Sequence, residues 1–163
     1  MTPDDLLHPL RTGVVPFLGL PLRLEPESVL GVVLGAPFDG GVIHRPGARL
    51  GPWILRQATL GLGRAPLPLR FQGDEGGVPG LAGEGWVDGG NLPTRPFDAQ
   101  EALAAVTEHM GRWAGLGART LLLGGDHLMT LGALRALARQ HGSLGLLMLD
   151  AHPDSADGLA WGT

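Results

Sequence analysis

The sequence predicts an α/β protein in which helices cover both faces of a parallel β-sheet. Two observations lead to this fold class. Short apolar runs alternate with segments of helical periodicity, which is typical of successive β-α-β units. The apolar runs also lack polar interruptions, as expected for strands that are buried on both faces. The chain has 163 residues, which is enough for a single domain.

The first quarter of the chain is expected to hold an irregular arm, one strand and one short helix. Residues 1–28 are Pro-rich and weakly patterned, and they form the predicted arm. Residues 30–34 are apolar and are followed by Gly and Pro, which predicts a buried strand. A Gly-rich loop follows at 39–51, and Pro52 then suits the first turn of a short helix.

The rest of the chain predicts three more strands and two longer helices. Residues 61–85 are rich in Gly and Pro and are expected to form a long surface loop. Apolar side chains then recur at spacings of three and four residues in two segments, each followed by Gly, which predicts helices with glycine C-caps. The predicted helices span 98–116 and 129–141, and the predicted strands span 86–88, 120–123 and 144–149.

The composition excludes several classes of function. The chain has no Cys, which removes disulfides, thiolate nucleophiles and Cys-ligated zinc. It has no Lys, which removes Schiff-base chemistry and the phosphate-binding lysine of a P-loop. None of its three Ser lies in a G-x-S-x-G elbow, so a serine hydrolase is disfavoured.

The charge and the hydropathy pattern bear on partners and location. The net charge of −4 argues against nucleic acid or an anionic membrane surface as the main partner. No apolar stretch reaches the roughly 18 residues that a membrane span needs. The N-terminus begins acidic, unlike a signal peptide, so a cytoplasmic protein is expected.

Two clusters of Asp and His follow predicted strands and carry the expected chemistry. Gly124-Gly125-Asp126-His127 follows one strand, and Asp150-Ala151-His152-Pro153-Asp154 follows the next. Alternate residues of an extended chain point to the same side, so Asp150, His152 and Asp154 would project together. The C-terminal ends of parallel strands lie at the same edge of a sheet, where α/β proteins place their ligands. His127 would therefore join these three side chains in one crevice.

Carboxylates and imidazoles without sulfur favour a divalent ion such as Mn²⁺, Zn²⁺, Fe²⁺ or Co²⁺. Two ions that share a carboxylate would lower the pKa of water between them and supply hydroxide near neutral pH. The alternative is that Asp and His after a strand simply cap the next turn. Asp126 is interpreted as a loop-fixing or supporting residue rather than a ligand. The other histidines, His8, His44, His109 and His141, are interpreted as structural or surface residues.

Four stretches appear in the order and spacing of one enzyme family. They are LGAPFDGGVIHRPGARLGPWILRQAT (34–59), VDGGNLP (87–93), LLLGGDHLMTLGALRALA (121–138) and LMLDAHPDSADG (147–158). Through them the chain resembles the ureohydrolases, which include arginase, agmatinase, guanidinobutyrase and formimidoylglutamase. The likeness is greatest to the agmatinase branch and covers nearly everything after residue 28.

The resemblance implies a three-layer α/β/α fold, of which residues 29–163 would be the N-terminal half, and a binuclear Mn²⁺ site. By motif position His127 would bind one ion with Asp154, His152 would bind the other, and the catalytic Asp150 would bridge both. The implied substrate is a small guanidino or amidino compound, hydrolysed with release of urea in the agmatinase case. Arg45 and Arg49, in HRPGAR, are interpreted as loop-fixing residues.

The chain departs from the family pattern in three respects. It is about half the usual length, and it lacks the D-x-D-x-x-D-P stretch that supplies two more Asp ligands. Trp161 precedes Gly-Thr, where many members have a proton-transferring His. The family topology also implies that the strand at 120–123 and the one at 144–149 are not neighbours, which would expose apolar strand edges.

Three hypotheses follow from these departures. The chain is part of a truncated or split enzyme that needs a complementing C-terminal half, or it is a non-catalytic remnant or an interaction partner of an intact paralogue. The third hypothesis, a metal hydrolase of the related deacetylase-like fold, is disfavoured by the GGDH and PGAR motifs. A homo-oligomer is a further expectation.

Overall fold

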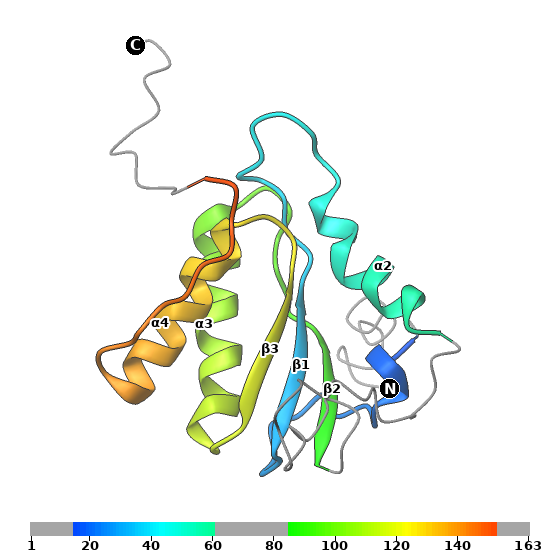
Figure 1. Cartoon of the computed structure of the whole chain (residues 1–163), viewed down its shortest axis with the longest axis vertical. Helices are drawn as coiled ribbons and strands as arrows, with labels where there is room; N and C mark the ends of the chain where they lie inside the picture. The colour runs from blue at the N-terminus through cyan, green and yellow to red at the C-terminus, as the bar shows by residue number, and fades with distance from the viewer. Residues whose placement is uncertain (1–14, 61–84, 153–163) are drawn as a thin grey trace, which may run out of the picture.

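The computed structural model describes residues 15–60 and 85–152 and has three parallel strands in one open sheet (Figure 1). The strands are β1 (Gly31–Ala36), β2 (Trp86–Asn91) and β3 (Arg119–Gly124), in the spatial order β2-β1-β3. Both neighbours of β1 run parallel to it. The predicted parallel α/β class is therefore confirmed.

Helices cover both faces of this sheet, so the described part has three layers (Figure 1). The helices α3 (Ala99–Gly115) and α4 (Leu128–His141) lie on one face, and α2 (Gly51–Ala58) lies on the other. Two short 3-10 turns, η1 (Phe17–Gly19) and η2 (Ala48–Leu50), complete the elements. The three-layer α/β/α architecture expected from the sequence is thus observed as a partial domain.

The central strand β1 is buried along its whole length because side chains pack against both of its faces. Val32 and Leu34 belong to the main core, together with Val106 and Trp113 of α3. Val33 points to the other face and packs with residues that include Leu20. This two-sided burial explains why the strand has no polar residue.

Most predicted elements agree with the structure to within a few residues. Strand β2 is longer than expected, because Gly89 and Gly90 continue the strand instead of ending it. The predicted arm is irregular where it is described, with the 3-10 turn η1 and an isolated parallel bridge between Leu22 and Asp88. The surface loop expected at 61–85 lies almost wholly outside the described residues.

The strand predicted at residues 144–149 is wrong. This segment has no strand conformation, and its apolar side chains are exposed, with Leu147 at 84% and Leu149 at 91% of full exposure. A strand needs a neighbour to accept and donate its backbone hydrogen bonds. In the part of the chain that the structure describes, the sheet ends at β3, and residues 144–149 pair with none of its strands.

Candidate metal centre

The expected metal-binding residues lie where β3 ends. Residues Gly124 and Gly125 turn the chain from β3 toward α4, and His127 immediately precedes that helix. Gly125 is required at this turn, since a Cβ atom there would lie 1.8 Å from the carbonyl oxygen of Phe38. This close backbone approach brings the chain after β1 against the chain after β3.

The structure brings His127, Asp150 and His152 together. The Nδ1 atom of His127 lies 3.7 Å from one carboxylate oxygen of Asp150, and the Nδ1 atom of His152 lies 3.7 Å from the other. The side chains of His127 and Asp150 are partly exposed, at 45% and 30%, whereas that of His152 is 79% exposed. Two imidazoles thus flank one carboxylate at the surface.

The conformation of Asp150 differs from the extended one that the sequence predicts. One oxygen of its carboxylate accepts a hydrogen bond from the backbone N–H of His152, at 2.9 Å, which is a local turn. That hydrogen bond lowers the pKa of Asp150, and the nearby His127 and His152 imidazoles lower it further. The carboxylate is therefore held in the charged form that a cation would need.

These three side chains do not by themselves form a complete metal-binding site. Within residues 15–60 and 85–152, no group of three or more His, Asp or Glu side chains is arranged to hold a metal ion. Asp154, the fourth expected ligand, lies outside the described residues. The donor chemistry, imidazole nitrogen with carboxylate oxygen, nevertheless fits a divalent ion such as manganese.

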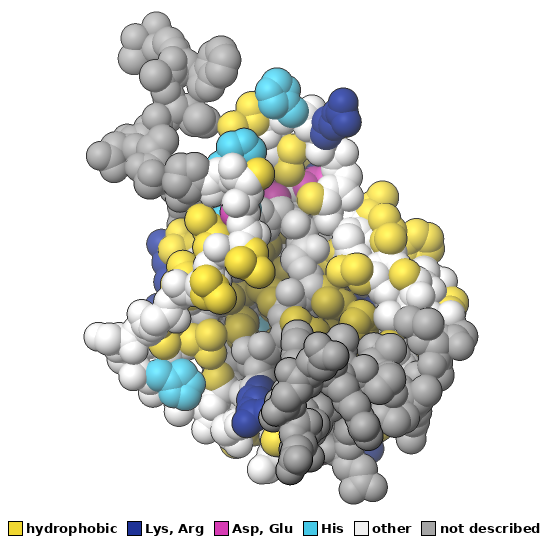
Figure 2. Space-filling view, viewed as in Figure 1, with side chains coloured by type: hydrophobic (Ala, Val, Ile, Leu, Met, Phe, Trp, Pro, Cys, Tyr) yellow, Lys and Arg dark blue, Asp and Glu magenta, His cyan; other side chains and the backbone are white. Residues whose placement is uncertain are grey.

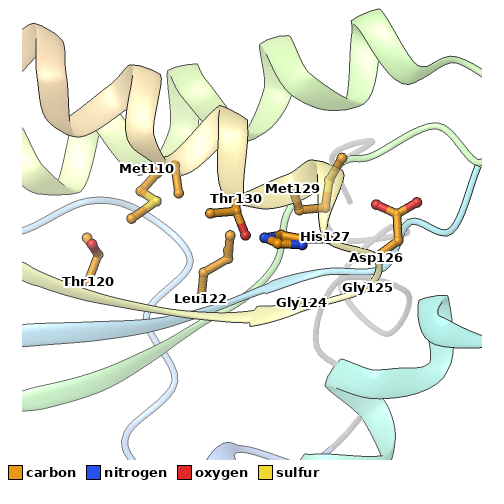
Figure 3. A pocket seen from close by; sticks show the side chains of 10 residues that line it. Met110, Thr120, Leu122, Gly124, Gly125, Asp126, His127, Met129 and Thr130 are labelled. Atoms are coloured by element: carbon orange, nitrogen blue, oxygen red, sulfur yellow. The ribbon is translucent and has the colours of Figure 1, made fainter. Parts of the chain in front are cut away.

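A hollow of about 390 Å³ adjoins the site between β3 and the helices α3 and α4 (Figure 3). The side chain of His127 lies in the wall of this hollow, over the end of β3 near Gly124. A second hollow, of about 730 Å³, lies between α4 and residues 146–150, and both His127 and Asp150 line it. His127 therefore borders both hollows, and Asp150 borders the second.

Asp126 fixes loops, as the sequence analysis favoured. Its carboxylate accepts hydrogen bonds from the backbone N–H groups of Gly41, at 2.7 Å, and Leu128, at 3.1 Å. Its own N–H donates to the carbonyl oxygen of Phe38, at 2.8 Å. Asp126 thereby joins the loop after β1 to the turn that carries His127.

A second carboxylate, Asp39, organises the loop after β1. It accepts hydrogen bonds from the backbone N–H of Gly47, at 2.7 Å, and from Nε of Arg49, at 2.6 Å. The hydrogen bond from the Arg49 guanidinium lowers the pKa of Asp39 to about 2. The loop-fixing role expected for Arg49 agrees with these contacts, and His44 and Arg45 of the same loop are exposed.

A buried ion pair that sequence reasoning missed supports the opposite face of the sheet. Arg56 of α2 donates from Nε and Nη2 to the two carboxylate oxygens of Asp88, each at 2.8 Å, and from Nη1 to Asn91, at 2.7 Å. Both side chains of the ion pair are 1% exposed. The signal in the sequence is Asp88 inside the buried strand β2, since charges are seldom fully buried without a partner. Arg56 gives no such signal, because most other residues of α2 are exposed.

Parallel strands between two helical layers, with Asp and His at the carboxyl edge, define an α/β protein whose candidate site lies at that edge. Residues 31–160 match the sequence profile of the arginase family. The chain belongs to this family.

Known relatives agree with the assignment. The chain is 36% identical to proclavaminate amidinohydrolase of Streptomyces clavuligerus, over 93% of this chain and 46% of that protein. It is 37% identical to agmatinase of Neisseria gonorrhoeae, over 86% of this chain and 45% of the relative. It is 31% identical to mitochondrial guanidino acid hydrolase of Homo sapiens, over 96% of this chain and 42% of the relative.

Solved structures show the same fold. A structure of the Streptomyces clavuligerus proclavaminate amidinohydrolase matches with a TM-score of 0.72 and 35% identity, over 91% of this chain and 48% of that one. A putative agmatinase from Clostridium difficile matches with a TM-score of 0.70 at 22% identity, over 85% and 47%, which supports the fold alone. The chain spans about half the length of the curated relatives that it matches.

Proposed function

We propose that the chain supplies part of a binuclear manganese centre that hydrolyses linear guanidines, and that it needs a complementing polypeptide to do so. His127, Asp150, His152 and Asp154 are the proposed ligands. Hydrolysis of such a substrate adds water across a carbon–nitrogen bond of the guanidinium group and releases urea and an amine. The proposed setting is the cytoplasm, and within the described residues no helix is both long and apolar enough to cross a bilayer.

The observation that supports this proposal is the position of the Asp150 carboxylate between two imidazoles. Each of its oxygens faces the Nδ1 atom of a different histidine, at 3.7 Å. A carboxylate that bridges two cations presents one oxygen to each, so this arrangement suits a shared ligand. Manganese, when bound, would lower the pKa of water and so supply a nucleophile near neutral pH.

The residues of this chain prepare that site in two ways. The backbone N–H of His152 fixes one Asp150 oxygen and keeps the carboxylate charged at neutral pH. Asp126 holds the turn before α4 and so positions His127. Neutral imidazole and ionised carboxylate are the forms in which these side chains bind metals.

The names of the relatives indicate the substrate class. The names guanidino acid hydrolase and agmatinase both indicate a substrate that carries a linear guanidine group. A terminal guanidine or amidine is therefore the proposed substrate for a complete site. We expect the 163-residue chain alone to release no measurable urea from agmatine with Mn²⁺ present.

Titration calorimetry with Mn²⁺ tests the ligand set. Asp150→Asn, which removes the charge and keeps the shape, is expected to weaken Mn²⁺ binding by about tenfold or more, since one ligand of the set is lost. Glu108→Gln makes the same chemical change on the exposed surface of α3 and is expected to leave affinity unchanged. Equal affinity in the Asp150 variant and the unmodified chain would remove Asp150 from the site.

A non-catalytic remnant, or an interaction partner of an intact paralogue, is the second candidate. The observation that favours it is the shortfall of ligands, since the described residues contain no closed metal site. The two candidates differ in stoichiometry when a complementing half is present. Two Mn²⁺ per complex support the enzyme, and one ion or none supports the remnant.

A further inference from the structure

We propose that residues 16–27 form a detachable strap that closes the outer edge of β2 and so keeps the sheet of one chain from pairing with that of a second copy. We call this segment the edge strap. In the spatial order β2-β1-β3, β2 has a neighbouring strand on one side, so its other side is an edge of the described sheet. An open edge is a template on which another chain can add a strand.

The edge strap pairs with β2 at one position. Leu22 forms a parallel bridge with Asp88 of β2. The N–H of Asp88 donates to the carbonyl oxygen of Pro21, and the N–H of Arg23 donates to that of Asp88, each at 2.9 Å. The chain itself therefore occupies the outward backbone groups of β2 at this position. A second copy would have to displace both hydrogen bonds to add a strand here.

The carboxylate of Asp88 attaches a second part of the edge strap. One of its oxygens accepts the N–H of Phe17, at 2.7 Å, and the other accepts the N–H of Gly90, at 2.8 Å. The ion pair with Arg56 fixes this carboxylate from the side of α2. The pairing of β2 with β1 also shifts register between Asp88 and Asn91, and such irregularities make an edge a poorer template.

The edge strap is anchored in both helical layers. On the side of α2, the N–H of Leu18 donates to the hydroxyl of Thr59, at 2.9 Å, and Leu20 is buried. The turn η1 accordingly lies beside α2 and β2 (Figure 1). On the side of α3, the guanidinium of Arg112 lies 3.3 Å from the carboxylate of Glu25. The strap therefore crosses the edge from one face of the sheet to the other.

The composition of the edge strap keeps it from becoming a new template. Pro16, Pro21 and Pro26 have no N–H to donate to a further strand. Arg23 and Glu27 form an exposed ion pair on it, at 3.1 Å. Proline and charged side chains are the means by which natural proteins protect sheet edges. The strap thus ends the sheet instead of extending it.

The backbone of Leu18 indicates that the strap is held in place by its contacts. Among the described residues it is the one non-glycine residue with positive φ, at 51°. This left-handed conformation is unfavourable for a leucine in isolation. The contacts of the strap must outweigh that cost, so we expect their loss to release the segment as a unit.

Two substitutions at Arg23 form a matched pair that tests this attachment. Arg23→Pro removes the N–H that the strap donates to β2, whereas Arg23→Ala removes the same side chain and keeps that N–H. Arg23→Pro should speed amide exchange at Phe17 and Asp88 by about tenfold or more and leave β3 unchanged. Arg23→Ala should stay within about twofold of the unmodified chain.

Self-association tests the role of the strap. Figure 2 shows hydrophobic side chains exposed where α2 and α4 lie in Figure 1, and both variants keep these surfaces. A difference between the two variants in light scattering after size exclusion therefore reports on the edge of β2. We expect Arg23→Pro to dimerise with a dissociation constant about tenfold or more below that of Arg23→Ala. Amide exchange in the dimer should show new protection in β2.

A second matched pair releases the strap without changing its own residues. Thr59→Val removes the acceptor of the Leu18 N–H, and Thr59→Ser keeps a hydroxyl there. The valine variant should show the faster exchange at Leu18 and the stronger self-association. This pair decides the question if Arg23→Pro does not fold, which circular dichroism establishes.

Three results would overturn the edge strap. Equal exchange at Phe17 and Asp88 in the proline and alanine variants would show that the bridge does not hold the segment. Release of the segment without stronger self-association would show that it does not guard the edge. A dimer whose new protection lies outside β2 would place the contact elsewhere. None of these measurements involves the metal centre, so they are independent of the proposed function.

Discussion

The Asp126 carboxylate lies 2.7 Å from the backbone N–H of Gly41 and joins two loops that are 85 residues apart in sequence. One loop follows β1 and the other carries His127. The second oxygen of the same carboxylate caps the backbone at Leu128. The position of His127 therefore depends on contacts that its own segment does not provide.

Substitution of Asp126 should loosen this junction. Asp126→Ala leaves two backbone N–H groups without their acceptor and is expected to cost about 1–2 kcal/mol in the free energy of unfolding. Asp126→Asn keeps one acceptor oxygen and should cost less than the alanine change. Urea unfolding measures both, and an alanine variant as stable as the unmodified chain would contradict the role of this carboxylate.

The buried ion pair of Arg56 and Asp88 should be the main contributor to stability on the face of the sheet that α2 covers. Arg56→Ala leaves a buried carboxylate without its cation and is expected to cost about 3–5 kcal/mol. The matched control is Arg112→Ala, which breaks an exposed pair with Glu25 and should cost about 0–1 kcal/mol. Thermal and urea unfolding compare the two, and similar losses would show that burial of the Arg56 pair is unimportant.

The ion pair of Asp39 and Arg49 predicts that the free energy of unfolding depends on pH in the acid range. The hydrogen bond from Arg49 lowers the pKa of Asp39 from 3.8 to about 2 in the folded protein. A lowered carboxyl pKa contributes stability above the unfolded value, and that contribution is lost as pH falls through the folded value. The stability difference between the unmodified chain and Asp39→Asn should thus be constant above about pH 5 and shrink between pH 4 and pH 2. A difference that stays constant over that range in urea unfolding would exclude this contribution.

Gly132 should resist substitution although it lies inside a helix. A Cβ atom there would lie 2.8 Å from Cβ of Val106, because α3 and α4 pack closely at this point. Gly132→Ala is therefore expected to destabilise the protein by about 1–3 kcal/mol through overpacking, which exceeds the gain in helix propensity. Gly111→Ala, whose nearest neighbour would be Ala136 at 4.0 Å, should instead stabilise by about 0.5–1 kcal/mol. A stabilising effect at both glycines in thermal unfolding would show that the helices can separate without cost.

The alternation of apolar strands and periodic helices could be predicted from the sequence, because each signal is local. The spacing of Leu103, Val106 and Met110 indicates the buried face of α3, and all three are buried. The candidate donors His127, Asp150 and His152 could also be named, because their residue types follow apolar runs. Their role as ligands stays a prediction.

Residues 144–149 show where local pattern fails. The run is apolar enough for a buried strand, but a strand also requires a neighbouring backbone, and none pairs with it within the described residues. The network of Arg56, Asp88 and Asn91 was missed for a related reason. Its members come from two elements that are distant in sequence, and their contact depends on how α2 lies on the sheet.

The sequence by itself determined most of the elements, their order and the donor chemistry, since these follow from side-chain type and spacing. The tertiary structure decided which of those groups meet. It placed His127 beside Asp150 without the expected strand, and it left one edge of β3 unpaired among the described residues. The physical reason is that hydrogen bonds between strands, and contacts between loops, depend on a second segment whose position no local pattern specifies.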